Sequence, residues 1–287
     1  MNPWLLAARP KTLAAAVVPV LVGTSMAMNA RAPLHWSSFL CALGGALFIQ
    51  IGTNLVNDAL DFKRGADTHE RLGPLRVTQA GLLSPNAVLA GAYLCFGLAA
   101  LCGIPLIVRG GWPIVAIGVV SILAAYAYTG GPYPLAYHGL GEVFVMIFFG
   151  LIAVGGSYYV QRLTIDWMVL VAGFAAGALA VILLAINNLR DIESDRASGK
   201  HTLAARFGAS FARREIEWLA MLVYLATIVF AYGQDWHLLV PLVTLPLAVI
   251  LVQRVKHSEG RELNRCLAMA GALEWLFGFT FVIGALI

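Results

Sequence analysis

The stretch NDALDFKRGAD at residues 57–67 closes a long apolar run and decides how the rest of the chain is interpreted. It has a counterpart 130 residues later, NNLRDIESD at residues 187–195, where a second apolar run ends in Asn, three residues and Asp. The matched pairs are Asn57 with Asp61 and Asn187 with Asp191. Six of the 15 acidic residues lie in these two segments: Asp58, Asp61, Asp67, Asp191, Glu193 and Asp195. This concentration of negative charge predicts a site that binds cations.

The composition excludes an ordinary soluble protein. The chain has 287 residues, of which 60% are hydrophobic and only 12% charged. Apolar runs long enough to cross a hydrocarbon core of about 30 Å recur from end to end. We therefore expect an all-α membrane protein in which residues 1–287 form a single domain with nine transmembrane helices. The expected spans are residues 12–28, 38–60, 85–108, 112–129, 140–160, 166–188, 215–233, 236–253 and 266–287.

The basic residues predict the orientation of this bundle. All but three of the 19 Lys and Arg residues fall in connections on one side, the exceptions being Arg31, Arg109 and Arg162. By the positive-inside rule that side faces the cytoplasm, which places the chain in the cytoplasmic (inner) membrane with both acidic segments at the cytoplasmic face. The net charge of +4 is then explained by topology, and no nucleic-acid partner is expected.

The two acidic segments also predict an internal repeat. They close the second and the sixth expected spans, four spans apart, so the chain divides into two related four-helix units with a ninth helix added. Because an even number of spans separates them, both segments lie on the same side. We expect the two units to enclose a central cavity whose cytoplasmic mouth is lined by both segments.

The spacing of the polar residues favours a magnesium site. Residues four apart share one face of a helix, so Asn57 aligns with Asp61, and Asn187 with Asp191 and Asp195. Such oxygen ligands suit Mg²⁺, which usually takes one or two carboxylates together with phosphate oxygens. The predicted ligands are Asn57, Asp58, Asp61, Asp67, Asp191 and Asp195. The basic residues available to hold a diphosphate are Lys63, Arg64, Arg71, Arg76, Arg190, Arg196, Lys200 and Arg206. The alternative is that all these residues are polar groups of a membrane interface whose cations only set the topology.

The paired motifs resemble those of the UbiA superfamily of intramembrane aromatic prenyltransferases, and the resemblance covers nearly the whole chain. Within it, five further stretches look like the 1,4-dihydroxy-2-naphthoate polyprenyltransferases of menaquinone synthesis. They are ARPKTL (8–13), DFKRGADT (61–68), YTGGPYPL (128–135), GLGE (139–142) and DRASGKHTL (195–203). The resemblance implies that Mg²⁺ and basic residues hold a polyprenyl diphosphate, that its allylic C–O bond ionises, and that the aromatic ring captures the cation with loss of CO₂. Catalytic roles then fall to Asn57, Asp61, Asn187 and Asp191, and the isoprenoid tail occupies a cavity open to membrane lipid.

Two departures from the pattern of the broad superfamily indicate which branch of it the chain resembles. Many relatives have a third Asp where this chain has Gly65, so Asp67 is expected to take that role, because Gly65 ends the helix and lets the chain curl back. Many relatives also have a basic pair where this chain has Gly130 and Gly131. That difference fits the naphthoate branch and argues against a 4-hydroxybenzoate enzyme.

Three other polar residues are candidates with open alternatives. Glu142 fits the aromatic-substrate pocket, although an acid at a helix N-terminus is also favoured by the helix dipole. Tyr128 fits a ring that shields an allylic cation, or an interfacial aromatic belt. Glu274, within the last span, fits either a functional or a packing role. Two other functions stay open: prenyl transfer to another aromatic acceptor, such as homogentisate, and cation-coupled transport. The sequence does not predict an oligomeric state.

Overall fold

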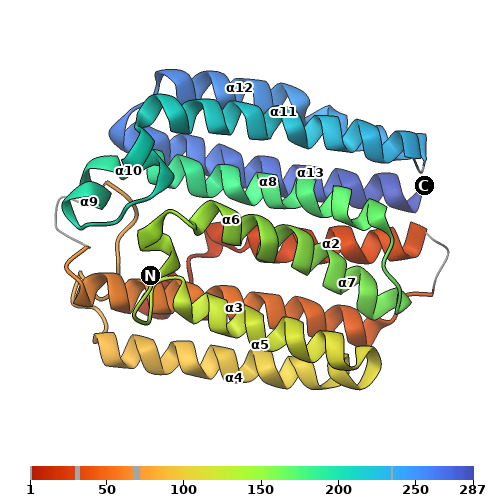
Figure 1. The fold of residues 1–287 in the computed structure, drawn as a ribbon, viewed down its shortest axis with the longest axis horizontal. Helices are drawn as coiled ribbons and strands as arrows, with labels where there is room; N and C mark the ends of the chain where they lie inside the picture. Colours follow the sequence, from red (N-terminus) through yellow and green to blue (C-terminus); the bar gives the residue numbers. More distant parts are fainter. Residues whose placement is uncertain (1, 30–32, 67–71, 234) are drawn as a thin grey trace.

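The computed structural model describes residues 2–29, 33–66, 72–233 and 235–287, and the regular structure in these ranges is helical throughout. The helices run nearly parallel to one long axis (Figure 1). The first half contains α1 (Pro3–Ala8), η1 (Pro10–Thr12), α2 (Ala14–Asn29), α3 (Trp36–Lys63), α4 (Pro85–Gly110) and α5 (Trp112–Ala127). The second half contains η2 (Leu135–His138), α6 (Gly141–Val145), η3 (Met146–Ile152), α7 (Ala153–Arg162), α8 (Trp167–Arg190), α9 (Ile192–Ala197), α10 (Leu203–Phe207), α11 (Ala209–Gly233), η4 (Trp236–Thr244), α12 (Leu245–His257), η5 (Gly260–Glu262) and α13 (Leu263–Leu286).

The apolar helices identify a multi-pass membrane protein. Each of the nine expected spans is helical over most of its length. Within the described ranges, seven helices are long and apolar enough to cross a membrane, and an eighth is obtained if the pair Pro3–Thr12 and Ala14–Met28, bent by 49°, counts as one span. The helix Trp112–Ala127 is apolar but shorter. A count of nine spans is therefore not confirmed.

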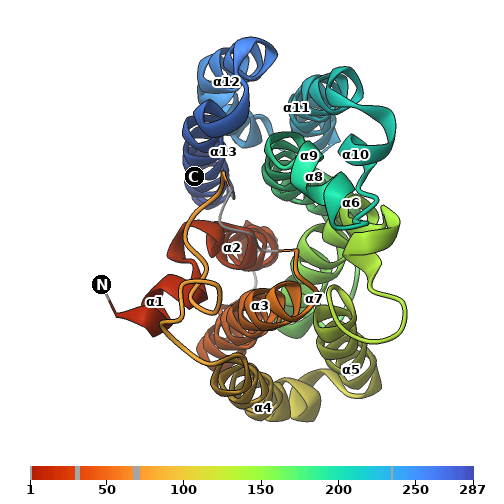
Figure 2. The same cartoon turned by 90° about the vertical axis from the view of Figure 1, so that its left-hand side faces the viewer.

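The bundle is built around α8. Of its apolar window 72% is buried inside the protein, against 22% for α4. Seen from one end, α4 and α5 lie at one extreme, α11 and α12 at the other, and α2, α3, α7 and α8 between them (Figure 2). The most extensive helix contacts are α3 with α4 and α8 with α11. These pairs hold the same position in the two expected four-helix units.

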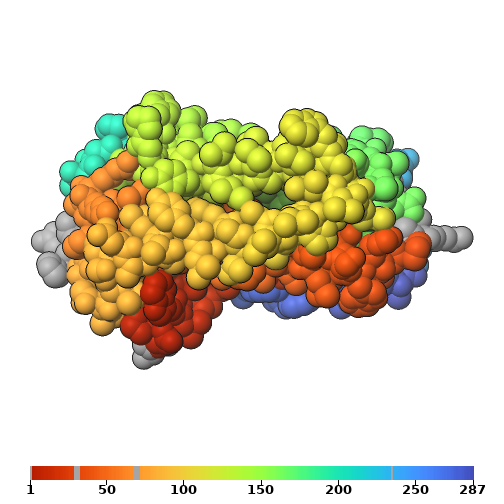
Figure 3. Space-filling model, turned by 90° about the horizontal axis from the view of Figure 1, so that it is seen from below, coloured from red at the N-terminus to blue at the C-terminus, as the bar shows by residue number. Residues whose placement is uncertain are grey.

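In Figure 3 the segments of α4 and α5, in yellow, lie at the surface of the protein. Large exposed side chains on these two helices are Tyr93, Leu94, Leu101, Ile104, Val108, Val119, Val120 and Leu123. In water such a continuous apolar face would be unusual, whereas contact with lipid tails satisfies it.

A stripe of glycines lets α8 approach the π-helical segment η3 closely. A Cβ added at Gly150 would lie 2.5 Å from the carbonyl oxygen of Gly173, and one at Gly177 would lie 2.9 Å from the Cα of Gly150. The spacing of Gly173 and Gly177 is the small-xxx-small pattern that allows membrane helices to pack backbone to backbone. This contact joins α8 to the helical span that begins at Gly141 and carries Glu142 in its first turn.

Both acidic segments lie at the same end of the bundle, on the left in Figure 1 and facing the viewer in Figure 2. We call it the motif end. There α3 stops as predicted at Gly65, whose φ of 71° is left-handed. The amide of Ala66 donates to the carbonyl of Asp61 at 2.9 Å, which completes a Schellman motif. The first motif thus occupies the last turns of a helix, not a loop beyond it.

Candidate active site

The last turns of α3 direct Asn57 and Asp61 toward the connection between α5 and α6. The hydroxyl of Thr129 donates to Asn57 Oδ1, and the hydroxyl of Tyr137 donates to Asp61 Oδ1 at 3.0 Å. The other carboxylate oxygen of Asp61 lies 3.4 Å from Arg76 Nη2. Asp61 is therefore buried but contacts a hydroxyl and a guanidinium, as an ionised carboxylate in a poorly solvated site requires.

Asp58 has a different environment, although it was predicted as a metal ligand. Asp58 is only 1% exposed, and both of its carboxylate oxygens accept hydrogen bonds from the segment that follows the first motif. The donors are the amide of Val77 at 3.2 Å and the amide of Thr78 at 3.0 Å, together with the Thr78 hydroxyl. In this geometry Asp58 anchors residues 77–78 against α3.

At the end of α8 the guanidinium of Arg190 organises the second motif. Its Nε donates to Asp191 Oδ1 at 2.8 Å, and its Nη2 donates both to Asp191 Oδ2 and to Asn187 Oδ1. Its Nη1 donates to Asn264 Oδ1 at 2.9 Å on α13. The Asn264 amide in turn donates to the carbonyl of Leu72 at 2.9 Å. Arg190 therefore fixes Asp191 and Asn187 and connects them, through α13, to the segment that follows the first motif.

Asp195 shows that the two motifs meet. Its pKa is raised to about 6, mainly by burial and also by repulsion from Asp191 and Asp61, while the charge of Lys200 acts in the opposite direction. Lys200 Nζ lies 3.8 Å from Asp195 Oδ1, and Thr202 contributes a hydrogen bond at 3.4 Å. Tyr137 and Lys200 connect the two motifs, because the Tyr137 hydroxyl donates to Asp61 while Lys200, beside Asp195, lies 5.8 Å from the centroid of the Tyr137 ring.

The connection between α5 and α6 brings cations and aromatic rings to this site. Arg64 donates to the carbonyls of Thr129 and Gly131 and lies 5.0 Å from the ring centroid of Tyr137. Lys200 lies 5.8 Å from the same ring, and the amide of His201 donates to the Tyr137 carbonyl at 3.0 Å. Burial and the neighbouring Asp61 carboxylate raise the pKa of the Tyr137 hydroxyl, which keeps it protonated as a donor.

Tyr128 and Glu142 complete the site on the side of α6. Burial, followed by the charges of Glu142, Asp61 and Asp195, raises the pKa of Tyr128, which keeps its hydroxyl protonated. Glu142 is only 6% exposed, and its Oε1 accepts a hydrogen bond from Asn188 Nδ2 at 2.8 Å. Asn187 and Asn188 are neighbours on α8 but have different partners, because successive helical residues point in different directions.

Three residues that were candidates for a functional role are not placed in the acidic site by the structure. Lys63 is exposed and donates to Asn86 Oδ1 at 3.2 Å, toward the start of α4. Asp67 lies outside the described residues. Glu274 is fully buried within α13, and its carboxyl makes no hydrogen bond to the described part of the chain.

The sequence analysis missed three residues of the site: Asn188, Asn264 and the role of Tyr137 as a donor to Asp61. A signal existed only for Asn188, which forms a pair with Asn187 at the end of an apolar run. Asn264 is 74 residues from its partner Arg190, and Tyr137 is 76 residues from its partner Asp61. The spacing of residues within each motif therefore could not predict these two contacts.

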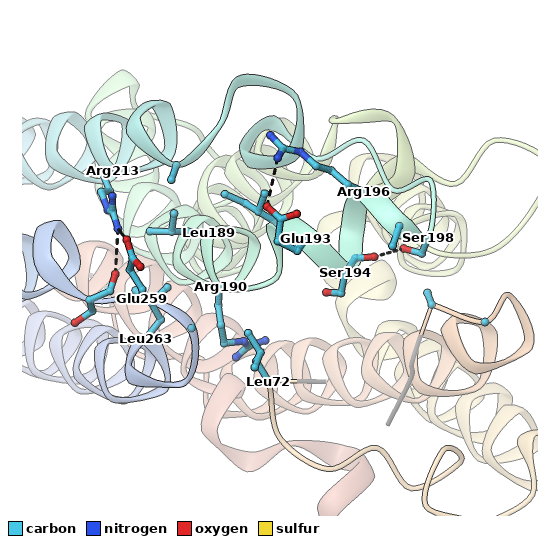
Figure 4. A pocket seen from close by; sticks show the side chains of 17 residues that line it. Leu72, Leu189, Arg190, Glu193, Ser194, Arg196, Ser198, Arg213, Glu259 and Leu263 are labelled. Atoms are coloured by element: carbon cyan, nitrogen blue, oxygen red, sulfur yellow. Dashed lines mark hydrogen bonds and ion pairs between the residues drawn. The ribbon is translucent and has the colours of Figure 1, made fainter. Parts of the chain in front are cut away.

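A surface pocket of about 650 Å³ lies behind the second motif (Figure 4). It is lined by Ile192, Glu193 and Arg196 of α9 and by Arg213 and Glu259, whereas Asp191 and Asp195 are not part of its lining. Its charged side chains pair with one another, Arg196 with Glu193 at 3.4 Å and Arg213 with Glu259 at 3.5 Å. Arg190, which holds Asp191 and Asn187, also lines this pocket, so the pocket adjoins the second motif.

The donor set of the acidic site fits a hard cation. Asn57, Asp61, Asn187, Asp191 and Asp195 offer only oxygen atoms, which Mg²⁺ prefers. The repulsion felt by Asp195 is what a bound cation relieves. Among the described residues there is no group of three or more His, Cys, Asp or Glu side chains arranged to hold a metal. The fit therefore rests on donor chemistry and charge.

Comparison with known proteins assigns this arrangement to a family. Residues 16–285 match the UbiA prenyltransferase family. The chain belongs to this family. A UbiA homolog from Archaeoglobus fulgidus, solved bound to GPP and Mg²⁺, has the same fold: its TM-score is 0.72 at 15% identity, and the match covers 100% of both chains. A UbiA homolog from Aeropyrum pernix gives a TM-score of 0.73 at 14% identity, over 93% of this chain and 97% of that one.

Two UbiA relatives are more similar in sequence. The 1,4-dihydroxy-2-naphthoate octaprenyltransferase of Mycobacterium tuberculosis is 38% identical over 284 residues, which cover 99% of this chain and 96% of the relative. The enzyme of the same name from Bacillus subtilis is 34% identical, over 97% of this chain and 90% of the relative. Both matches extend along nearly the whole chain.

The hydrogen bonds that Asp58 accepts from Val77 and Thr78 give a first prediction. Replacing Asp58 by Ala leaves the buried amides of Val77 and Thr78 without acceptors, which costs about 1–3 kcal/mol for each buried group left unpaired. We expect Asp58→Ala to lower the thermal unfolding midpoint in detergent and to expose residues 72–83 to limited proteolysis. Glu193→Ala, at a carboxylate that is 89% exposed, is the control and is expected to change neither. Equal stability of both variants would contradict the anchoring role of Asp58.

Proposed function

We propose that this chain transfers a polyprenyl group from polyprenyl diphosphate to 1,4-dihydroxy-2-naphthoate, with loss of CO₂ and diphosphate, to give demethylmenaquinol. The reaction class is supported by family membership and by the meeting of Asp61 with Asp191 and Asp195. The acceptor is supported by the two naphthoate octaprenyltransferases. A 27% identical relative from Synechocystis is a 2-carboxy-1,4-naphthoquinone phytyltransferase, so the acceptor class recurs while the prenyl donor differs.

The acids and amides of the two motifs bind the diphosphate end of the donor. Asp61, Asp191 and Asp195, with Asn57 and Asn187, would hold Mg²⁺, which when bound stabilises the negative charge of the leaving diphosphate. Arg190 keeps Asp191 and Asn187 in one orientation through four hydrogen bonds from its guanidinium to these two residues and Asn264. This preorganisation matters because charge stabilisation is usually the largest catalytic term.

Cations and rings from the α5–α6 connection act on the rest of the donor. Arg64 and Lys200 both contact the ring of Tyr137, and both supply positive charge for the oxygen atoms of the diphosphate. The electron-rich ring faces of Tyr128 and Tyr137 stabilise the allylic cation that ionisation produces. The isoprenoid tail, being wholly apolar, lies in the membrane-embedded part of the bundle.

We further propose that residues 1–287 act as one integral membrane domain with the motif end in the cytoplasm. The distribution of Lys and Arg supports this orientation, because nearly all of them lie in connections at that end. A water-soluble diphosphate product then leaves directly into the cytoplasm. A cation-coupled transporter is not favoured, because the acids lie at helix ends and the chain belongs to a prenyltransferase family.

The acceptor is tested by direct assay. Purified protein is incubated with Mg²⁺, geranylgeranyl diphosphate and one of three acceptors: 1,4-dihydroxy-2-naphthoate, 4-hydroxybenzoate or homogentisate. We expect prenylated naphthoquinol and an equal amount of CO₂ with the first acceptor only, detected by mass spectrometry and release of labelled carboxyl carbon. Turnover of another acceptor without turnover of the naphthoate would contradict the assignment.

The metal and diphosphate site is tested by two matched acids. Asp61→Ala and Asp191→Ala are expected to reduce kcat/KM by at least ~10³, because loss of one charge-stabilising group typically costs about 10² to 10³ and here an ion site is affected. Glu193→Ala is the control, since Glu193 lies between Asp191 and Asp195 in sequence but its side chain is 89% exposed. It is expected to keep kcat/KM within about threefold. Comparable losses in Glu193→Ala would show that general loss of charge, not the site, is responsible.

A further inference from the structure

One carboxylate oxygen of Glu142 is buried and has no hydrogen-bond donor in the described part of the chain. Glu142 is 6% exposed at the start of α6, and Oε1 accepts from Asn188 while Oε2 accepts from no side chain or amide. A buried acceptor without a partner costs free energy, about 1–3 kcal/mol in protein variants. Such a group is expected where a substrate supplies the missing donor.

Glu142 adjoins the acidic site through α8, because it bonds to Asn188 and the preceding residue, Asn187, is held by Arg190 beside Asp191. Tyr128 feels the charges of Glu142, Asp61 and Asp195 together, and the charge of Lys200 acts on Glu142 as well as on Asp195. The hydroxyl of Tyr128 also lies 3.1 Å from the point that a Cβ on Gly141 would occupy. Glu142 therefore lies next to the groups that hold the diphosphate in the proposed function, on the side of α6 and α8.

The ring that captures the allylic cation has to lie next to the diphosphate, because the new bond forms at the carbon from which the diphosphate departs. The acceptor carries hydroxyl groups, which are the donors that Oε2 lacks. The bond from Asn188 to Oε1 leaves Oε2 as the basic oxygen and keeps the carboxylate from rotating.

We propose that Glu142 is the general base for the acceptor, and that Asn188 is the residue that positions it. This role rests on the proposed function. As the ring attacks, the O–H bond of the hydroxyl next to the attacked carbon breaks, and its proton goes to Glu142 Oε2. The electron pair moves through the ring to form the C–C bond to the allylic carbon of the cation, whose C–O bond to the diphosphate has already broken.

The second half of the reaction returns the proton. The ring now holds a carbonyl where the hydroxyl was, and the attacked carbon carries both the prenyl group and the carboxylate. Loss of CO₂ breaks the bond between that carbon and the carboxylate, and the released electron pair restores the aromatic ring. The carbonyl oxygen takes the proton back from Glu142. Glu142 ends ionised, no oxidant or reductant is consumed, and the product is the quinol.

The test compares Glu142→Gln with Glu142→Asp and with the control Glu217→Gln. Gln keeps the size of the side chain and its acceptor for Asn188 but cannot take a proton, and Glu217 is an exposed acid on α11 paired with Lys256. Two rates are measured with geranylgeranyl diphosphate and Mg²⁺: prenylation of 1,4-dihydroxy-2-naphthoate, and release of diphosphate by hydrolysis of the donor without acceptor.

We expect Glu142→Gln to lower kcat for prenylation about 10² to 10⁴-fold, the usual contribution of general acid–base catalysis, while donor hydrolysis stays within about threefold of wild type. Glu142→Asp should recover part of the loss, and Glu217→Gln should leave both rates unchanged. Asn188→Ala should lower kcat by about 10 to 10²-fold, because a misplaced base is less effective. Parallel loss of both rates in Glu142→Gln, or no loss of prenylation, would overturn the proposal.

The pH dependence supplies a readout that a structural role would not change. Without the base, the variant must use acceptor that is already ionised in solution, so its prenylation rate should rise about tenfold per pH unit relative to wild type between pH 7 and 9. The other titratable groups whose charges act with Glu142 are Tyr128, Lys200 and Glu215, and they are the same in both proteins. A ratio that does not vary with pH would overturn the role of Glu142. Absence of naphthoate prenylation by the wild type would overturn the proposed function itself.

Discussion

The repulsion among Asp61, Asp191 and Asp195 at the motif end is the constraint on which the rest of the structure depends. These carboxylates belong to buried residues, where charge is poorly solvated, and two of them raise the pKa of the third. Acids in such a place persist only if cations or donors compensate them. Arg76, Arg190 and Lys200 each contact one of the three, and each comes from a connection or helix end at this side of the bundle. In the proposed function, a bound cation would further compensate these acids and would pair with the charge of the diphosphate.

The membrane architecture and the two motifs follow from local sequence. A lipid-embedded segment has to satisfy its own backbone hydrogen bonds, so each long apolar run forms a helix. Every expected span is accordingly helical over most of its length. The stop at Gly65 was also predictable, because a left-handed residue that ends a helix is usually glycine. The helix Trp112–Ala127 ends two residues earlier than the expected span, whereas the 49° bend before Ala14 was not predicted.

The functions of individual polar residues were harder to predict, because their partners are distant in sequence. Asp58 and Asp61 are three residues apart in one motif, yet Asp58 anchors Val77 and Thr78 while Asp61 meets Tyr137 and Arg76. Likewise Asn187 bonds to Arg190, whereas its neighbour Asn188 bonds to Glu142. Only the three-dimensional structure separates the residue that holds a loop from the residue that faces the site, and that separation is what makes Glu142 a candidate base.

The central claim is that acids of the two motifs form one binding site, and a double-mutant cycle on affinity tests it most directly. Binding of an unreactive geranylgeranyl thiolodiphosphate in the presence of Mg²⁺ is measured by titration calorimetry for wild type, Asp61→Asn, Asp195→Asn and the double variant. If the motifs share the site, the loss of binding free energy in the double variant should differ from the sum of the single losses by at least ~1 kcal/mol, because groups in contact with a common ligand couple. Losses that add within ~0.5 kcal/mol would show two independent acids and contradict the account.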